Sequence, residues 1–346
     1  MRVFHSPASA LHDPALYFRR GTMVTHPEQA DRYAILHQAV SGAHAVTQAG
    51  DHGIEPILAV HDAGYVAFLR DTWERRHELP GVDDEVLSGH FSRPHMSKRP
   101  EGLLGLIGYY TADTSTPIRA GTWAAIHAGA QIAVDTADTA LGEGVAYALC
   151  RPPGHHAYAD SAGGFCFLNN SGIAARRMQA NVAAREGRPA RVAILDIDVH
   201  HGNGTQGIFY EADDILTISV HADPADYFPY YAGYAEETGA GAGVGYNLNL
   251  PLPHGEGDSA FHRAIEKGLE RIAAYAPDAL VVALGLDASE HDPIGALRVT
   301  TRGFEQAAGL IGSTGLPTAL IQEGGYLCDA LPDNLSAFLA GFEGGR

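Results

Sequence analysis

The sequence predicts an α/β protein, a single domain with an open, mostly parallel β-sheet and helices on both faces. Apolar strand-like runs alternate with amphipathic helical patterns along most of the chain, and repeated strand and helix units of this kind build parallel sheets. With 346 residues, 45% of them hydrophobic, the chain is long enough to bury a large core. No internal repeat or low-complexity tail divides it. We therefore expect one domain over residues 1–346.

The individual elements follow from runs of apolar residues and from helical periodicity. The expected strands are Val145–Cys150, Val192–Asp196, Ile215–Val220, Ala279–Gly285 and Pro317–Gln322. The expected helices lie near Ile173–Glu186, Thr205–Glu211, Ala260–Tyr275 and Arg302–Ser313. Two segments are expected to be long loops, Pro80–Thr122, which carries several prolines and mixed charge, and Ala222–Tyr246, which is rich in Gly and Tyr. We expect Pro80–Thr122 to lie outside the core.

Composition limits the classes of partner. The formal net charge of −18 argues against binding a phosphate backbone and so against a nucleic-acid partner. Acidity is compatible with attracting cationic small molecules, but it also serves simply to keep a protein dispersed. No apolar run is long enough to span a bilayer, and the polar N-terminus lacks a signal-peptide core, so we expect a cytoplasmic protein without a membrane partner. Three scattered cysteines, Cys150, Cys166 and Cys328, are read as small buried hydrophobes.

The strongest chemical signal follows the strand Val192–Asp196. This apolar run continues directly into Asp196-Ile-Asp198-Val-His200-His-Gly-Asn-Gly204. Buried carboxylates and imidazoles are costly unless they are paired or bind a metal. While the backbone stays extended, Asp196, Asp198 and His200 would share one side. The spacing indicates metal ligands, and the alternative is a helix cap or a salt-bridged pair at a strand end.

Polar residues also follow the other predicted strands. His155-His156 follow the first strand, and Asp287 and Tyr326 follow the last two. Ligands of open parallel sheets bind outside the carboxyl ends of the strands. Asp287 can complete a metal site, His155-His156 can act in acid–base catalysis, and the Tyr326 hydroxyl can donate to an oxyanion. Taken singly, these residues would instead be a helix cap, two surface histidines and a packed tyrosine.

Together, these motifs resemble the zinc-dependent histone deacetylase superfamily with the arginase-like fold, most closely its bacterial acetylpolyamine amidohydrolases. The resemblance covers nearly the whole chain. It is carried by Arg151-Pro-Pro-Gly-His-His156, Gly163-Gly-Phe-Cys-Phe-Leu-Asn-Asn170, Asp196-Ile-Asp-Val-His-His-Gly-Asn-Gly-Thr205, Ser219-Val-His221, Leu284-Gly-Leu-Asp287 and Glu323-Gly-Gly-Tyr326, and further by His61-Asp-Ala-Gly-Tyr-Val66 and Ile107-Gly-Tyr-Tyr110.

The resemblance implies a role for each matching residue. It implies one Zn²⁺ per subunit, with Fe²⁺ as the alternative, on Asp198, His200 and Asp287. His156 would be the general base and then acid, His155 its electrostatic partner, and Tyr326 the hydroxyl that polarises the carbonyl. A structural K⁺ would bind Asp196, Ser219 and the main-chain oxygens of Asp198, His200 and Val220. Asn203 stands where eukaryotic deacetylases have an aspartate behind the base.

The same resemblance implies how substrate is bound. Phe165 and Phe228 would form the tunnel walls, beside Gly164. The Pro80–Thr122 segment would support a homodimer and narrow the tunnel, and Ser115 occupies the position of a carboxylate that contacts the substrate amine in the polyamine enzymes. Acidic rim candidates for that amine are Asp113, Glu290, Glu101 and Asp226.

The expected function is metal-dependent hydrolysis of N-acetylated polyamines or other small acetylated amines to acetate and free amine. The alternative within the same chemistry is a broad deacetylase of acetyl-lysine peptides. A sensor that binds acetylated amines without turnover would not need His156 and Tyr326. A binuclear manganese ureohydrolase would need additional His and Asp ligands, and Gly202-Asn203-Gly204 lacks the third glycine of a nucleotide-binding loop.

Overall fold

An eight-stranded sheet forms the centre of the molecule. The computed structural model of the chain describes residues 1–82, 84–93, 95–96 and 98–346. The strand order is β4-β1-β5-β10-β9-β6-β7-β8, and all neighbouring strands run parallel. The strands are β1 (Arg2–His5), β4 (Ala45–Gln48), β5 (Val145–Ala148), β6 (Val192–Asp196), β7 (Ile215–Ala222), β8 (Asn247–Leu252), β9 (Ala279–Leu284) and β10 (Thr318–Gln322). The predicted α/β class, with one open parallel sheet, is confirmed.

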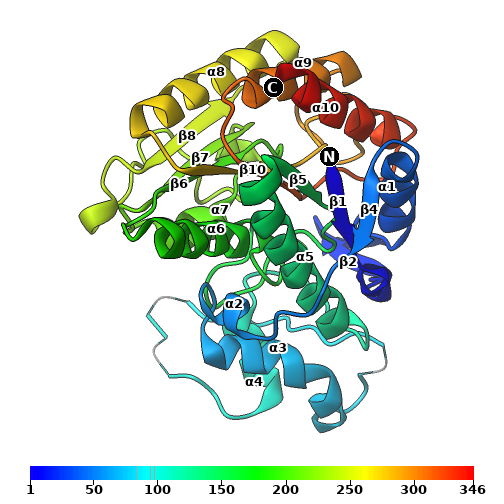
Figure 1. The fold of residues 1–346 in the computed structure, drawn as a ribbon. Helices are drawn as coiled ribbons and strands as arrows, with labels where there is room; N and C mark the ends of the chain where they lie inside the picture. The colour runs from blue at the N-terminus through cyan, green and yellow to red at the C-terminus, as the bar shows by residue number, and fades with distance from the viewer. Residues whose placement is uncertain (83, 94, 97) are drawn as a thin grey trace.

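Helices cover both faces of this sheet, as Figure 1 shows. Helices α1, α8, α9 and α10 lie on one face, and α5, α6 and α7 lie on the other. The α-helices are α1 (Asp31–Ser41), α2 (Glu55–Leu58), α3 (Ala63–Arg75), α4 (Leu103–Tyr110), α5 (Thr122–Glu143), α6 (Asn170–Glu186), α7 (Asn203–Phe209), α8 (Asp258–Tyr275), α9 (Thr301–Gly312) and α10 (Leu331–Gly345). Short 3₁₀ helices are η1 (Pro7–Leu11), η2 (Arg76–Glu78), η3 (Pro224–Asp226) and η4 (Gly241–Gly243).

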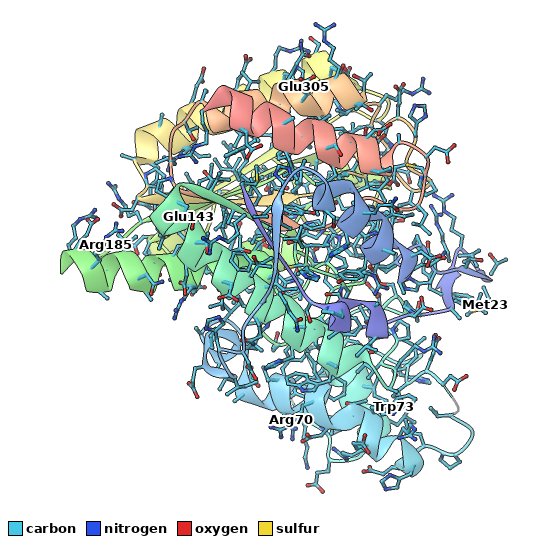
Figure 2. The ribbon with its side chains drawn as sticks, turned by 45° about the vertical axis from the view of Figure 1, so that its right-hand side comes forward. Met23, Arg70, Trp73, Glu143, Arg185 and Glu305 are labelled. Atoms are coloured by element: carbon cyan, nitrogen blue, oxygen red, sulfur yellow. The ribbon has the colours of Figure 1, made fainter. Side chains whose placement is uncertain are left out.

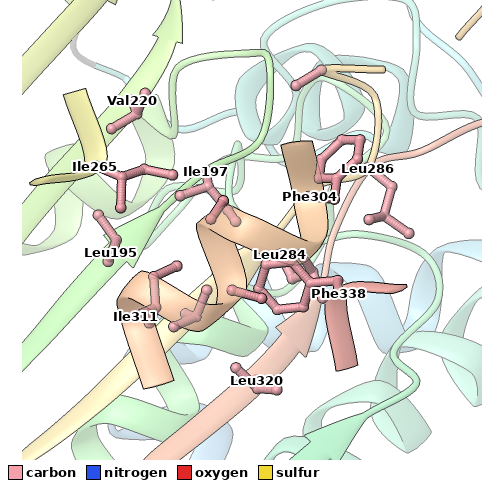
Figure 3. Packing of buried hydrophobic residues seen from close by; sticks show 14 of the residues in the cluster. Leu195, Ile197, Val220, Ile265, Leu284, Leu286, Phe304, Ile311, Leu320 and Phe338 are labelled. Atoms are coloured by element: carbon pink, nitrogen blue, oxygen red, sulfur yellow. The ribbon is translucent and has the colours of Figure 1, made fainter. Parts of the chain in front are cut away.

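Alternating side chains of the strands pack into two separate hydrophobic cores, one on each face of the sheet. On β6, Leu195 packs with the α8–α10 layer, whereas its neighbour Ile194 packs with α5 and α6. Figure 3 shows Leu195, Leu284 and Leu320 from three strands against Phe304 and Phe338 of the covering helices. Burying each of these side chains contributes about 1.5–3 kcal/mol. This packing fixes the strand ends from which the polar loops emerge.

All five predicted strands are present, with ends that differ by at most two residues. The four predicted helices are also present, displaced by at most three residues at their ends. The sequence analysis did not predict the sheet strands β1, β4 and β8, nor the helices α1 to α5 and α10. Cys150 and Cys166 are buried as expected, whereas Cys328 is only partly buried.

The expectation that Pro80–Thr122 lies outside the core is wrong for part of this segment. It contains α4, whose Leu103, Leu106, Ile107 and Tyr110 are buried. Their spacing of three and four residues forms one helix face. That face packs with α2, α3 and the outer side of α5 in a third hydrophobic cluster. The three residues outside the described ranges also belong to this segment.

A separate two-stranded antiparallel hairpin stands at the N-terminal side. It pairs β2 (Leu16–Arg19) with β3 (Thr22–Thr25) through a turn at Arg20-Gly21. Both turn residues have positive φ, 50° and 87°, as in the two-residue turns that suit the twist of β-hairpins. Met23 of β3 lies at the outer edge of the molecule (Figure 2). Across the described ranges, no helix is both long and apolar enough to cross a bilayer.

Candidate active site

A cavity of about 260 Å³ opens at the carboxyl edge of the sheet. Its walls come from the N-terminal hairpin, from the loops around residues 113–115 and 164–165, and from segments that follow β6, β7, β9 and β10. The lining residues are Tyr17, Phe18, Arg19, Arg20, Asp113, Thr114, Ser115, His156, Gly164, Phe165, His200, Tyr227, Phe228, Tyr230, Ile294 and Tyr326. Residues far apart in sequence therefore meet at one edge, as the sheet topology predicts.

Asp198, His200 and Asp287 converge next to this cavity. One ligand atom of each lies within 4.8 Å of the others, and all three residues are buried. They do not converge for the reason expected, because β6 ends at Asp196 and the extended strand stops there. Instead, Asp196 Oδ1 accepts from the Asp198 N–H and Asp198 Oδ1 accepts from the His200 N–H. These side-chain turns direct the loop.

The donor set fits a divalent cation. Asp198 Oδ1 and Asp287 Oδ2 lie 3.1 and 3.3 Å from the same atom, His200 Nδ1. Asp287 Oδ2 is buried and has no hydrogen-bond partner within the described residues. Burial, and then the charge of Asp198, raises the pKa of Asp287. Two buried carboxylates that repel each other around one imidazole are relieved by a cation, and an Asp, His and Asp set is of the type that binds zinc.

The two histidines after β5 are held by different acceptors. The ring centres of His155 and His156 lie 4.0 Å apart. His155 Nδ1 lies 2.9 Å from Asp196 Oδ2, and His156 Nδ1 lies 2.6 Å from Asn203 Oδ1. Because the Asn203 amide donates from Nδ2 to the Tyr158 hydroxyl, its carbonyl faces His156 and accepts the Nδ1 proton. This leaves the Nε2 lone pair of His156 free to take a proton.

The surroundings of these two imidazoles shift their pKa values in opposite directions. Burial opposes protonation of His155, but Asp198 and Asp196 outweigh it and raise its pKa to about 10. Burial, followed by the positive charge of His155, lowers the pKa of His156 well below its usual range. The pair therefore combines one charged and one neutral ring, and the neutral ring lines the cavity.

Tyr326 also lines the cavity. Its backbone N–H donates to Asp292 Oδ2 at 2.8 Å, and the Arg32 guanidinium lies 4.8 Å from its ring centre. Burial raises the pKa of Tyr326 well above its usual value. The phenol therefore keeps its proton and can act as a donor in the cavity.

Phe165, Phe228 and Gly164, the residues expected to form the tunnel walls, all line the cavity. The Phe228 ring lies edge-on to His156 with 4.9 Å between centres. Gly164 has φ +54°, and a Cβ at this position would lie 2.4 Å from His156 Cδ2 and 2.9 Å from Phe228 Cε1. Only glycine allows the backbone to pass so close to the histidine.

The two side chains predicted to bind a monovalent cation lie on adjacent strands. Asp196 of β6 and Ser219 of β7 are direct partners in the parallel register, and Val220 follows Ser219. Ser219 Oγ also lies 2.8 Å from His221 Nδ1. The main chains of Asp198 and His200 belong to the loop that leaves β6. The role of this group stays a prediction.

The four carboxylates predicted for the rim differ in whether they line the cavity. Asp113 lines the cavity, but its oxygens accept from the Ser115 N–H, the Ser115 hydroxyl and the Gly164 N–H. Glu290, Glu101 and Asp226 are exposed and are not among the residues that line the cavity. Asp113 thus shapes the wall, and the other three are not brought to the site.

Several functional positions escaped the sequence analysis. Tyr227 stacks on His200 with 4.8 Å between ring centres and an angle of 10°. Glu323, quoted above only as part of a motif, accepts from the N–H groups of Gly154 and His155 and from the Ser171 hydroxyl. Its place directly after β10, in line with the other site residues, was the available signal.

The N-terminal hairpin contributes four residues to the cavity wall, Tyr17 to Arg20. No sequence motif marks this contribution, since Arg19-Arg20 reads as an ordinary solvated charge pair.

This fold and site define the class of protein. Residues 26–342 match the family described as the histone deacetylase domain, so the chain belongs to that family. The predicted superfamily is confirmed, and with it a deacetylase-type hydrolase whose family uses a catalytic metal.

Among known proteins, the chain is similar to acetylpolyamine amidohydrolases. It is 43% identical over 345 residues to the one from Burkholderia pseudomallei, covering 99% of this chain and 98% of the relative. It is 46% identical over 299 residues to acetylpolyamine amidohydrolase 1 of Pseudomonas aeruginosa, covering 85% and 84%. The crystal structure of the Burkholderia pseudomallei acetylpolyamine aminohydrolase superposes with a TM-score of 0.93 at 42% identity, covering 100% of this chain and 99% of that one.

Proposed function

We propose that this protein is a metal-dependent amidohydrolase that releases acetate from N-acetylated polyamines or other small acetylated amines. The observation that carries the proposal is the convergence of Asp198, His200 and Asp287 beside a narrow cavity that also presents His156 and Tyr326. The names of its relatives support the acetylated amine as substrate. A water molecule supplies OH to the acetyl carbon and a proton to the leaving amine.

We assign the ion to Asp198, His200 and Asp287 and propose that it is Zn²⁺, with Fe²⁺ as the alternative. When bound, such an ion supplies Lewis-acid activation of water and of the acetamide carbonyl. The carboxylates would balance the charge of the ion. The stacked ring of Tyr227 fixes the orientation of the His200 imidazole. Asp287 Oδ2 is buried without a hydrogen-bond partner within the described residues, which supports this assignment.

His156 moves the proton in this proposal. Its Nε2 accepts the proton of the attacking water and returns it to the nitrogen of the leaving amine. Asn203 keeps the proton of the neutral ring on Nδ1 and stabilises the imidazolium by accepting from it. His155, paired with Asp196, supplies positive charge beside the reacting group.

Tyr326 stabilises the oxygen that gains negative charge as the acetyl carbon becomes tetrahedral. Its hydroxyl is a neutral donor in a buried wall, where a hydrogen bond to an oxyanion is worth more than in water. The Asp292 carboxylate fixes its backbone. Phe165 and Phe228 exclude water from the alkyl chain of the substrate.

Two further proposals accompany this function. A K⁺ ion bound by Asp196, Ser219 and the main-chain oxygens of Asp198, His200 and Val220 would stabilise the loop that carries the zinc ligands. The 80–122 segment, through the exposed Leu104 of α4, would form part of a homodimer interface that narrows the tunnel.

The test is a substrate panel on protein of defined metal content. Acetylputrescine, acetylcadaverine and an acetyl-lysine peptide are compared by kcat/KM before and after chelation. We expect turnover of small acetylated amines that chelation abolishes and Zn²⁺ restores. Chelator-resistant turnover, or no acetate from any small acetamide, would contradict the proposal. Preference for the peptide would favour the broad acetyl-lysine deacetylase instead.

A further inference from the structure

Tyr158 contacts the side chain that supports His156, although Tyr158 itself is not among the residues that line the cavity. Its hydroxyl accepts from Asn203 Nδ2 at 3.2 Å, and Asn203 Oδ1 lies 2.6 Å from His156 Nδ1. Tyr158 is half-buried, and the amide of Asn203 lies between the phenol and the imidazole. Tyr158 can therefore influence the reacting groups only through Asn203.

The backbone that carries these groups is fixed by other contacts. The Thr205 N–H of α7 donates to the His155 carbonyl at 3.1 Å. A Cβ at Gly204 would overlap the carbonyl oxygen of Ala157, so the start of α7 packs backbone to backbone against the histidine loop. These contacts leave the side chain of Asn203 free to rotate, since the terminal torsion of an amide side chain has a broad energy minimum.

Gly207 allows the Tyr158 ring to lie on α7. Gly207 and Asn203 are four residues apart in this helix and share one of its faces. A Cβ at Gly207 would overlap Cδ1 and Cε1 of Tyr158, so the ring lies directly on the helix backbone. Any side chain at position 207 would displace the ring and, with it, the hydroxyl that Asn203 contacts.

A neutral amide needs such an anchor more than a carboxylate does. Either oxygen of a carboxylate accepts from an imidazole through a charge-assisted bond, whereas an amide accepts through one end only. A rotated Asn203 would no longer offer its carbonyl to His156. We propose that Tyr158 is a positioning residue that holds Asn203 in the orientation in which it supports the general base. The inference rests on the proposed function and adds to it a residue outside the cavity.

The first test removes only the hydroxyl. Tyr158→Phe keeps the ring, and kcat is measured with the acetamide that the wild type hydrolyses fastest. We expect kcat to fall about three- to tenfold, as for one lost hydrogen bond, while KM and bound metal stay within about twofold. Tyr33→Phe is the matched control, because the hydroxyl of this half-buried tyrosine lies 2.8 Å from His5 Nδ1, outside the cavity wall. It should leave kcat unchanged.

Two combined variants separate positioning from a general loss of structure. In the Asn203→Asp background, Tyr158→Phe should change kcat by less than about twofold, because a carboxylate accepts through either oxygen. Gly207→Ala should lower kcat as Tyr158→Phe does, although alanine favours a helix more than glycine. Combining Gly207→Ala with Tyr158→Phe should cost no more than either change alone, since both act on the same contact.

The outcomes distinguish the inference from the function on which it rests. Wild-type kcat in Tyr158→Phe, an equal loss in the Asn203→Asp background, or additive losses with Gly207→Ala would overturn the positioning role, while acetate release keeps the proposed function. An equal loss in Tyr33→Phe would also overturn it, since removal of any half-buried tyrosine hydroxyl would then be responsible. Wild-type protein that releases no acetate from any acetamide would overturn the proposed function and the inference with it.

Discussion

The floor and the mouth of the cavity are built in opposite ways. The floor is made of loops that leave buried strands, and its polar atoms are held by the core, as when Asp198 Oδ2 accepts from the Gly324 N–H. We call the part of the cavity wall formed by Tyr17–Arg20 of the N-terminal hairpin the mouth. The hairpin residues Phe18 and Met23 are 51% and 57% exposed. Because the polar groups of the floor hydrogen-bond to one another, we expect substitutions there to cost more activity than substitutions of the exposed hairpin side chains.

The largest expected effect tests the floor. Asp287→Ala removes one proposed metal ligand, so activity should fall by at least about 1,000-fold, together with bound metal. Metal analysis and kcat/KM with an acetylated amine measure both. Asp226→Ala, at an exposed carboxylate that does not line the cavity, should leave metal content unchanged. A fully metallated and active Asp287 variant would contradict the assignment.

The next effect separates the metal from the oxyanion donor. Tyr326→Phe removes one hydroxyl and should lower kcat by about 100- to 1,000-fold while the metal stays bound. Tyr231→Phe is the control, since Tyr231 is 92% exposed and is not among the residues that line the cavity. Turnover of the Tyr326 variant within threefold of wild type would exclude this role.

A smaller effect concerns the ring that supports His200. Tyr227→Leu removes the stacked ring and should weaken metal binding by about tenfold, measured by competition with a chelator. Tyr227→Phe keeps the ring and should restore most of that affinity. If both variants bind metal like the wild type, the stack has no positioning role.

Substitutions at two glycines with positive φ allow the floor and the mouth to be compared directly. Gly164→Ala places a Cβ 2.4 Å from the His156 ring, whereas Gly21→Ala in the hairpin turn meets nothing within 4 Å. Both should lose about 1–2 kcal/mol of unfolding free energy from backbone strain. Only Gly164→Ala should also lose acetamide turnover, by about tenfold or more. Equal losses of activity would mean that the mouth is as constrained as the floor.

The sequence analysis predicted the floor well for a physical reason. Strands buried on both faces are continuous apolar runs, so a cluster of Asp and His directly after one has no packing explanation and indicates a site. Asp198, His200 and Asp287 were found in this way, and the structure brings them together. The predicted extended alignment failed because the chain turns immediately after Asp196, through hydrogen bonds that no periodicity reveals.

The mouth was predicted poorly because its residues owe their position to tertiary contacts alone. Arg19 and Arg20 look like any solvated charge pair until the hairpin folds over the cavity. Conversely, Glu290 looked suitable as a rim acid but is not brought to the cavity. The face of α4 was overlooked because the prolines and charges around it dominate the composition of 80–122.

Glu323 has a consequence for how the reacting groups keep their spacing. It stands three residues before Tyr326, and its carboxylate also accepts from the N–H groups of Gly154 and His155. One buried side chain therefore ties the backbone that carries the phenol to the backbone that carries the imidazoles. The distance between the phenol and the imidazoles is therefore set when the protein folds. A substrate that binds between them does not have to order these segments.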